Sequence, residues 1–392
     1  MSYLFNSTGY PIYNEEVIKG SGCYVYDSRG NKYLDLEAGV WTLPLGHNDP
    51  DVSAAMHRQI DEIIHVGYKY NHLIGEKCAQ KLLKIADIDY GKCVFLTSGS
   101  EAVEYGVQLA RAIRRNKKCV CLTGQYLAAY GQCMEQKESQ WETISWDYHH
   151  SKSVEEYYEE ISDEIDFSNI GVFVFEAGNS SGLVKLPPRN LVTAISQLAK
   201  ENDVVIVVDE VTCGIGRTGK WFGYMNYNLK PQIIATGKGM GNGYPVSAVI
   251  IKESIIAEVE KTDFHFAQSH QNDPMGCRVA YEVLNKIEKL DLLCNVVNMG
   301  TYFLESYRKL QQEIPIISEI RGCGLLICIE LSKEISIEFM REIDRSLFQR
   351  GFIAGVKVNE RVIRTYCPLT ITMEKIDSFI VALKAILVTL KK

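Results

Sequence analysis

Short apolar runs alternate along most of the chain with longer segments in which apolar residues recur at helical spacing. The runs expected to be strands are residues 92–96, 119–123, 172–175, 204–208, 233–235 and 246–251. Several are apolar throughout, as strands covered on both faces of a sheet are. Helical patterns lie between them, for example at 101–115 and 191–201. This order predicts an α/β unit with a mostly parallel sheet and helices on both faces.

The C-terminal part of the chain has a different pattern. A helical stretch over about residues 274–310 leads into a strand-like run at 324–331, and then come a helix, a short strand pair and a terminal helix. This predicts a smaller α+β unit, and the opening hairpin at 23–36, with turn residues 27–31, is expected to join it. We therefore expect an N-terminal segment (1–45) that joins the small domain, a large domain (46–290) and a C-terminal small domain (291–392).

Composition narrows the class of protein. The 392 residues are 46% hydrophobic, enough for a large core, and the net charge of −7 comes from interleaved acids and bases rather than a basic stripe for nucleic acid. No apolar run approaches the ~20 residues that span a bilayer, and the N-terminus lacks the features of a secretion signal. The 12 cysteines form no CxxC pair or zinc-ligand set, and His149-His150 has no partner at metal-ligand spacing. We expect a cytoplasmic protein with reduced thiols and no metal, membrane or nucleic-acid partner.

Ionisable side chains follow three of the predicted strands. Glu176 comes after the run at 172–175, Asp209 after 204–208, and Lys238 shortly after 233–235. In open parallel sheets, ligands bind beyond the carboxyl ends of the strands. Each residue alone could be a cap or a surface residue, but together they predict a site at this edge.

The segment Thr97-Ser98-Gly99-Ser100 joins a predicted strand to a predicted helix. Small residues allow close approach of an anion, and the first helical N–H groups and the helix dipole favour negative charge there. The segment therefore predicts a phosphate site, and an ordinary helix cap by Ser98 or Ser100 is the alternative.

Asp209 and Lys238 each allow two interpretations. A carboxylate after a fully apolar strand needs a cationic partner, either a ligand or a base such as Arg217. Lys238 lies in a glycine-rich run that matches neither GxxxxGK[ST] nor GxGxxG, which argues against a nucleotide site. It is either a reactive amine near a ligand or a surface lysine in a flexible loop.

Several motifs together resemble one enzyme family, the class III aminotransferases, which use pyridoxal 5'-phosphate (PLP) and have fold type I. The most specific matches are Ser98-Gly99-Ser100-Glu101-Ala102, Asp209-Glu210-Val211 with Gly216-Arg217-Thr218-Gly219, and Gly237-Lys238 with Gly243-Tyr244-Pro245. Their order and spacing fit the family, and the resemblance covers nearly the whole chain. It implies a transaminase similar to those acting on acetylornithine, ornithine or 4-aminobutyrate.

The resemblance also implies roles for individual residues. Lys238 would carry PLP as a Schiff base and move the substrate proton, and Asp209 would pair with the pyridine nitrogen. Val211 and Tyr126 would cover the two faces of the ring. The phosphate would be held by Ser98, Gly99 and Ser100 and, from a neighbouring subunit, by Ser269, which makes a homodimer with shared sites the expected assembly.

Four positions depart from the family pattern. Leu127 stands where a histidine often follows the stacking aromatic residue, and Thr212 replaces the glutamine beside the cofactor phenol oxygen. The family's Glu-Pro is Glu176-Ala177 here, and we expect Glu176 to belong to the cofactor site. Ser181 replaces a glutamate that in many relatives pairs with the arginine aligned with Arg364.

Without that glutamate, Arg364 is expected to be free to bind a substrate carboxylate, and a structural ion pair is the alternative. Val40 and Trp41 align with positions that line the substrate pocket, although core packing would equally explain Trp41. The sequence does not identify the amino donor.

Two other functions use the same scaffold. An amino-acid racemase, epimerase or aminomutase would keep the same lysine and aspartate, and the missing glutamate permits this reading. A PLP-sensing regulator would carry a DNA-binding domain, and no basic helix-turn-helix pattern precedes the first motifs.

Overall fold

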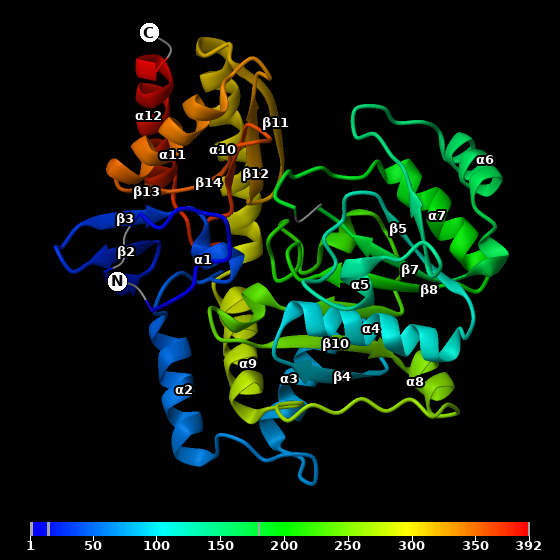
Figure 1. Ribbon diagram of the computed structural model, residues 1–392. Helices are drawn as coiled ribbons and strands as arrows, with labels where there is room; N and C mark the ends of the chain where they lie inside the picture. The colour runs from blue at the N-terminus through cyan, green and yellow to red at the C-terminus, as the bar shows by residue number, and fades with distance from the viewer. Residues whose placement is uncertain (1–2, 14–15, 179–180, 391–392) are drawn as a thin grey trace.

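A seven-stranded sheet in the order β4-β10-β9-β8-β7-β5-β6 lies inside the larger part of the protein (Figure 1). The computed structural model describes residues 3–13, 16–178 and 181–390. The strands are β4 (Gly91–Leu96), β5 (Lys118–Leu122), β6 (Trp141–Ile144), β7 (Ile170–Glu176), β8 (Val205–Glu210), β9 (Ile233–Thr236) and β10 (Ser247–Lys252). The strands from β9 to β6 run parallel, whereas β10 is antiparallel to both of its neighbours. The predicted mostly parallel α/β sheet is confirmed, but the sequence did not predict β6 or the direction of β10.

Both faces of this sheet are buried, which explains its apolar strands. In β7, Phe173 and Phe175 belong to one core cluster, and Val172 and Val174 belong to the other. Helices α4 (Gly99–Ile113) and α8 (Glu253–Val259) cover the second face, while α3 (Leu73–Ile85), α6 (Val154–Glu164), α7 (Arg189–Glu201) and α9 (Pro274–Lys289) contribute to the first core. Helix α2 (Pro50–Glu62) packs beside α9 (Figure 1).

The predicted helical stretch over 274–310 is two helices. Helix α9 ends at Lys289 and α10 (Leu292–Glu313) begins after Asp291, whose φ of 48° lies in the left-handed region. An L-residue in this conformation cannot continue a right-handed helix. The prediction of one continuous stretch was therefore wrong, although the helical periodicity on both sides of the break is real.

The two ends of the chain meet in the smaller part of the molecule. The opening hairpin forms a sheet with a late strand, in the order β1 (Val17–Ser21), β2 (Tyr24–Asp27), β3 (Lys32–Asp35) and β13 (Phe352–Ile353). A second sheet has the order β11 (Ile317–Cys323), β12 (Leu326–Leu331), β15 (Val362–Thr365) and β14 (Gly355–Lys357). Helices α10, α11 (Ile337–Gln349) and α12 (Met373–Leu390) pack around these strands (Figure 1).

The parallel pair β3–β13 joins the opening hairpin to the C-terminal elements. Within the hairpin, the Asp27 carboxylate accepts the N–H groups of Arg29 and Asn31, which fixes the turn. The domain boundaries at residues 45 and 290 stay a prediction.

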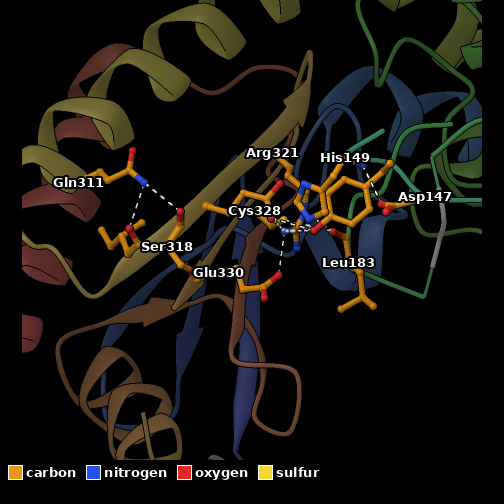
Figure 2. A network of polar contacts seen from close by, with 11 residues as sticks. Asp147, His149, Leu183, Gln311, Ser318, Arg321, Cys328 and Glu330 are labelled. Carbon is orange, nitrogen blue, oxygen red and sulfur yellow. Dashed lines mark hydrogen bonds and ion pairs between the residues drawn. The ribbon is translucent and has the colours of Figure 1, made fainter. Parts of the chain in front are cut away.

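A polar network around Arg321 ties the segment that follows β7 to the small-domain sheet (Figure 2). The Arg321 Nε donates to the Leu183 carbonyl at 3.0 Å. The Arg321 Nη1 contacts the carboxylates of Glu319 at 2.5 Å and Glu330 at 2.8 Å. The Cys328 thiol also donates to the Leu183 carbonyl, at 3.4 Å. The two bonds to its carbonyl fix Leu183 against β11 and β12, close to the candidate site.

Candidate active site

A cavity of about 560 Å³ lies where β8 and β9 end. It is lined by Thr8, Tyr10, Val40, Trp41, Ser98, Gly99, Ser100, Tyr126, Leu127, Ser181, Asp209, Val211, Thr212, Lys238, Lys357 and Arg364. All of the predicted site residues except Glu176 and Ser269 are on this wall. The volume falls in the range of small-molecule sites, roughly 300–1,000 Å³.

Lys238 is a buried amine rather than a surface lysine. Its Nζ donates to Thr212 Oγ1 at 2.8 Å and lies 4.6 Å from the centre of the Trp41 ring. Burial lowers the pKa of Lys238, against the opposing effects of Asp209 and Glu176. The residue has a φ of 40°, a strained conformation that is often found at functional sites. The surface-loop interpretation was wrong.

Asp209 is the next-to-last residue of the buried strand β8 and is 4% exposed. Its Oδ1 accepts the Val211 N–H at 2.9 Å. Burial raises the pKa of Asp209 to about 7, although the Val211 N–H and Lys238 both lower it. Arg217 instead donates to the Cys367 carbonyl, and the described residues show no ion pair between Arg217 and Asp209. The carboxyl group is thus placed to receive a cationic donor in the cavity.

The first turn of α4 serves both as a helix cap and as a candidate anion site. Ser98 is the N-cap, and its hydroxyl accepts the Glu101 N–H at 3.2 Å. The next two N–H groups, of Gly99 and Ser100, have no acceptor within a helix. The Ser100 hydroxyl accepts the Ala129 N–H at 2.9 Å, so its own proton remains available for an anion. A Cβ on Gly99 would lie 2.4 Å from Val211, so only glycine fits there.

The wall formed by Val40 and Trp41 is a left-handed turn. Four successive residues of α1 (Ala38–Trp41) have positive φ: 46°, 58°, 61° and 71°. The Asp35 carboxylate holds this turn by accepting the N–H groups of Glu37 at 2.9 Å and Gly39 at 3.0 Å. Each non-glycine residue in this region costs about 1–3 kcal/mol.

Trp41 combines the two roles that the sequence left open. Its ring packs 4.7 Å from the Tyr366 ring in the core, and it also forms part of the cavity wall. The guanidinium carbon of Arg364 lies 4.7 Å from the centre of the same ring. Trp41 therefore lies near two of the basic side chains on the cavity wall, Lys238 and Arg364.

Arg364 is not free, and the prediction that it would be was wrong. Its Nε and Nη2 donate to the two Glu37 oxygens at 2.9 and 3.2 Å, so a glutamate from the N-terminal segment occupies the guanidinium. Burial lowers the pKa of Arg364, but Glu37 raises it more, so the net shift is upward.

Two glycines leave the space that the Arg364–Glu37 ion pair occupies. A Cβ on Gly182 would lie 2.0 Å from Arg364 Nη1, and one on Gly355 would lie 2.1 Å from Glu37 Oε1. Of the two interpretations of Arg364, the structure shows the ion pair, and carboxylate binding stays a prediction.

Two predicted residues lie outside the cavity wall. Glu176 is fully buried at the end of β7, paired in register with Asp209, and its carbonyl accepts a hydrogen bond from Gln125. Its charge acts on Lys238 without lining the cavity. Ser269 lies in the connection between α8 and α9, so its role toward a neighbouring subunit stays a prediction.

Four residues of the site were not predicted from the sequence. Thr8, Tyr10 and Lys357 line the cavity, and Glu37 pairs with Arg364. Thr8 and Tyr10 belong to an N-terminal segment without regular structure, and Lys357 lies on the short strand β14. The Glu37 carboxylate in the mostly apolar run before Trp41 was the one available signal, because a carboxylate largely shielded from water needs a cation.

An α/β fold with a buried amine, a buried carboxyl group and a helix N-terminus around one cavity defines an enzyme that binds an anionic organic cofactor. The chain belongs to the aminotransferase class-III family, whose model matches residues 7–387. It is a PLP-dependent aminotransferase, and nothing in its relatives supports the racemase, epimerase or aminomutase alternative.

Curated relatives match over nearly their whole length. The acetylornithine aminotransferase of Aquifex aeolicus is 30% identical over 99% of this chain and 100% of its own. The acetylornithine aminotransferase of Caldanaerobacter subterraneus subsp. tengcongensis is 32% identical over 94% of this chain and 92% of its own.

Solved structures give the same fold. A Bacillus anthracis aminotransferase has a TM-score of 0.87 at 25% identity, over 96% of this chain and 94% of its own. The ω-transaminase of Pseudomonas jessenii in complex with PMP has a TM-score of 0.87 at 21% identity, over 96% of this chain and 92% of its own.

Proposed function

We propose that this aminotransferase moves an amino group from a carboxylate-bearing donor of the acetylornithine type to a 2-oxo acid such as 2-oxoglutarate. The names of the two curated relatives support this donor class. The observation that carries the proposal is the Lys238 amine, buried in the cavity beside Thr212 and within the influence of Asp209.

The residues of one half of the cavity fit PLP. Asp209 would hold the pyridine nitrogen, because a carboxyl group buried to this degree is stabilised by a cationic N–H donor. Ser98, Gly99 and Ser100 would hold the phosphate at the start of α4, and Val211 and Tyr126 would cover the ring.

When bound, PLP supplies an electron-poor ring that weakens bonds at the substrate carbon that bears the reacting amino group. Lys238 then accepts a proton at Nζ and returns it. Burial lowers the Lys238 pKa and so favours the neutral amine that this transfer requires. The Thr212 hydroxyl accepts a hydrogen bond from Nζ and orients it, while Trp41 limits its movement on another side.

Arg364 would bind the substrate carboxylate in competition with Glu37. A carboxylate can occupy the two donors, Nε and Nη2, that Glu37 occupies in the structure. The guanidinium then stays over Trp41, and the carboxylate of Glu37 has to find another partner or move toward solvent. Val40 and Trp41 would contact the carbon chain of the substrate.

We also propose a cytoplasmic homodimer. The segment 60–73 exposes a group of large apolar side chains, as a subunit contact would: Ile60, Ile63, Ile64, Tyr68, Tyr70 and Leu73. Ser269 would then reach the phosphate site of the second subunit. The free cysteines favour a reducing compartment, and no helix in the described ranges has the length and apolarity to cross a membrane.

A donor panel tests the function. Holoenzyme is mixed with each amine, first alone and then with 2-oxoglutarate, and both products are quantified. A carboxylate-bearing donor should convert the bound cofactor to its amine form stoichiometrically when alone, and should give glutamate when the oxo acid is added. Inversion of the donor's configuration without loss of its nitrogen would contradict a transaminase.

A further inference from the structure

Two histidines and an aspartate from distant parts of the sequence meet outside the active-site cavity. His65 follows α2, and His270 and Asp273 precede α9, so about 205 residues separate the two segments. One candidate ligand atom from each residue lies within 4.8 Å of the other two. We infer that His65, His270 and Asp273 form a binding site for a divalent transition-metal ion, with Zn²⁺ as the representative ligand.

The distances between the candidate ligand atoms are close to those in a metal site, and small side-chain rotations would complete the match. Zn–N and Zn–O bonds near 2.1 Å at tetrahedral angles place two ligand atoms about 3.4 Å apart. Asp273 Oδ1 lies 3.1 Å from His65 Nδ1 and 3.9 Å from His270 Nδ1. The two imidazole rings lie 5.0 Å apart, tilted by 53°. Small side-chain rotations, which the exposed histidines can make, would equalise the distances.

The carboxylate is already held by a second contact. Asp273 Oδ2 accepts the Gly276 N–H as the N-cap of α9, so Oδ1 remains directed at the two imidazoles. The preceding residue, Asn272, exchanges backbone and side-chain hydrogen bonds with Phe95 on β4 at 2.9 Å. Metal ligands are typically oriented by such outer contacts, which reduce the ordering cost of binding.

A plain His–Asp ion pair is the competing explanation for these contacts, and the α9 dipole works against a cation at this end of the helix. The second imidazole decides in favour of a metal. A single His65–Asp273 pair would satisfy the carboxylate, yet His270 Nδ1 also approaches the same oxygen. Two imidazoles and one carboxylate suit Zn²⁺ and similar ions and are poor ligands for Mg²⁺, which prefers oxygen.

The position suggests what the ion would do. It would cross-link the connection after α2 to the loop before α9, which also contains Ser269. His65 lies within the exposed apolar segment 60–73, so the ion would sit beside the proposed subunit contact. The three protein ligands leave at least one coordination position for water or for a group of the second subunit. We therefore assign the site a structural role in fixing this loop.

Zinc titration of the metal-free holoenzyme by calorimetry tests the site. Wild type should bind about one Zn²⁺ per chain, and Mg²⁺ should not compete. His65→Ala and His270→Ala should each weaken the affinity at least about tenfold, because loss of even an outer contact costs that much. Bound Co²⁺ should show visible ligand-field absorption without the sulfur charge-transfer bands that the exposed Cys294 would give.

His150→Ala is the matched control, since His150 makes an exposed pair with Asp147 at 2.7 Å and should not contribute. Thermal unfolding without metal checks that each variant folds. Both variants should fold, because His65 and His270 are exposed and their removal leaves no cavity in the core. Equal zinc affinity in wild type and in both cluster variants would overturn the proposal, as would a loss confined to His150→Ala.

Discussion

The two halves of the active-site cavity are built in different ways. The cofactor half consists of the ends of β8 and β9 and the first turn of α4, where the backbone itself sets the positions of Asp209, Lys238 and Gly99. The substrate half consists of a strained left-handed turn and an ion pair between residues 327 positions apart, Glu37 and Arg364. Sheet geometry fixes the first half, and side-chain pairing fixes the second.

This difference suggests which half can change between relatives. The cofactor half needs a parallel sheet edge and a helix N-terminus, which tolerate few alternatives. In the substrate half, Glu37 pairs with the Arg364 guanidinium. We expect substitutions here to change substrate choice while the chemistry of the cofactor half is kept.

Removal of the Lys238 amine should have the largest effect. Lys238→Ala deletes the group that moves the proton, so kcat should fall at least about 1,000-fold, within the range of general acid–base catalysis. Single-turnover kinetics with an excess of donor measure this directly. Lys333→Ala, at an exposed lysine, is the control. A variant of Lys238 that reacts with donors as fast as wild type would falsify the assignment.

Gly99→Ala should disturb the cofactor half alone. The new Cβ would lie 2.4 Å from Val211 Cγ1, and such overpacking costs about 1–3 kcal/mol, or up to about 100-fold in PLP affinity. Equilibrium dialysis of PLP measures the change. Adding Val211→Ala should recover part of the loss by removing the clash. Gly106→Ala, in the middle of the same helix with a nearest contact of 3.1 Å, should change PLP affinity little.

Arg364→Ala should disturb the substrate half alone. Loss of a charge-assisted pair of about 1.5–3 kcal/mol should raise KM for carboxylate substrates about 10- to 100-fold and leave PLP affinity unchanged. Glu37→Gln should instead lower KM, because the substrate no longer displaces a carboxylate. Both variants should unfold at lower temperature, since each leaves one member of a buried pair alone.

A primary amine that lacks a carboxylate is the internal control for this pair of variants. Its KM should be the same in wild type, Arg364→Ala and Glu37→Gln. An equal change for amines with and without a carboxylate would show that Arg364 acts only as a structural ion pair.

The stability of the cofactor half should depend on pH through Glu210. Burial raises its pKa to about 8, although the N–H groups of Gly223 and Tyr224 lower it. A folded pKa above the unfolded value means that stability is complete below the unfolded pKa and is lost as pH rises toward 8. Between pH 6 and 8 the free energy of unfolding should fall by roughly 2 kcal/mol. Glu210→Gln should remove this contribution, and an unchanged slope of stability against pH would contradict it.

Val40→Gly should have the smallest effect, and it should raise the free energy of unfolding rather than lower it. Glycine adopts a φ of 61° without strain, and Val40 is 59% exposed, so little burial is lost. Chemical denaturation should show a gain of about 1 kcal/mol. Val52→Gly, at a buried residue inside α2, should destabilise instead. A loss of stability in Val40→Gly would mean that the turn is not strained.

The same contrast explains how much the sequence could predict. Residues 98–100, 209–212 and 238 belong to local motifs on predicted elements, so their convergence followed from sheet geometry. The Glu37–Arg364 pair and the His65–Asp273 contact join segments that no local pattern connects. The direction of β10 was hidden for a related reason: an apolar run has the same composition whichever way the strand points.

The pairing of β3 with β13 has a consequence for synthesis of the protein on the ribosome. The opening hairpin emerges before its parallel partner at Phe352–Ile353, and Arg364 follows Glu37 by 327 positions. A nascent chain can therefore complete its central sheet well before its first residues find their place. Glu37 has no guanidinium partner until Arg364 has been made, so we expect this ion pair to form after the central sheet has folded.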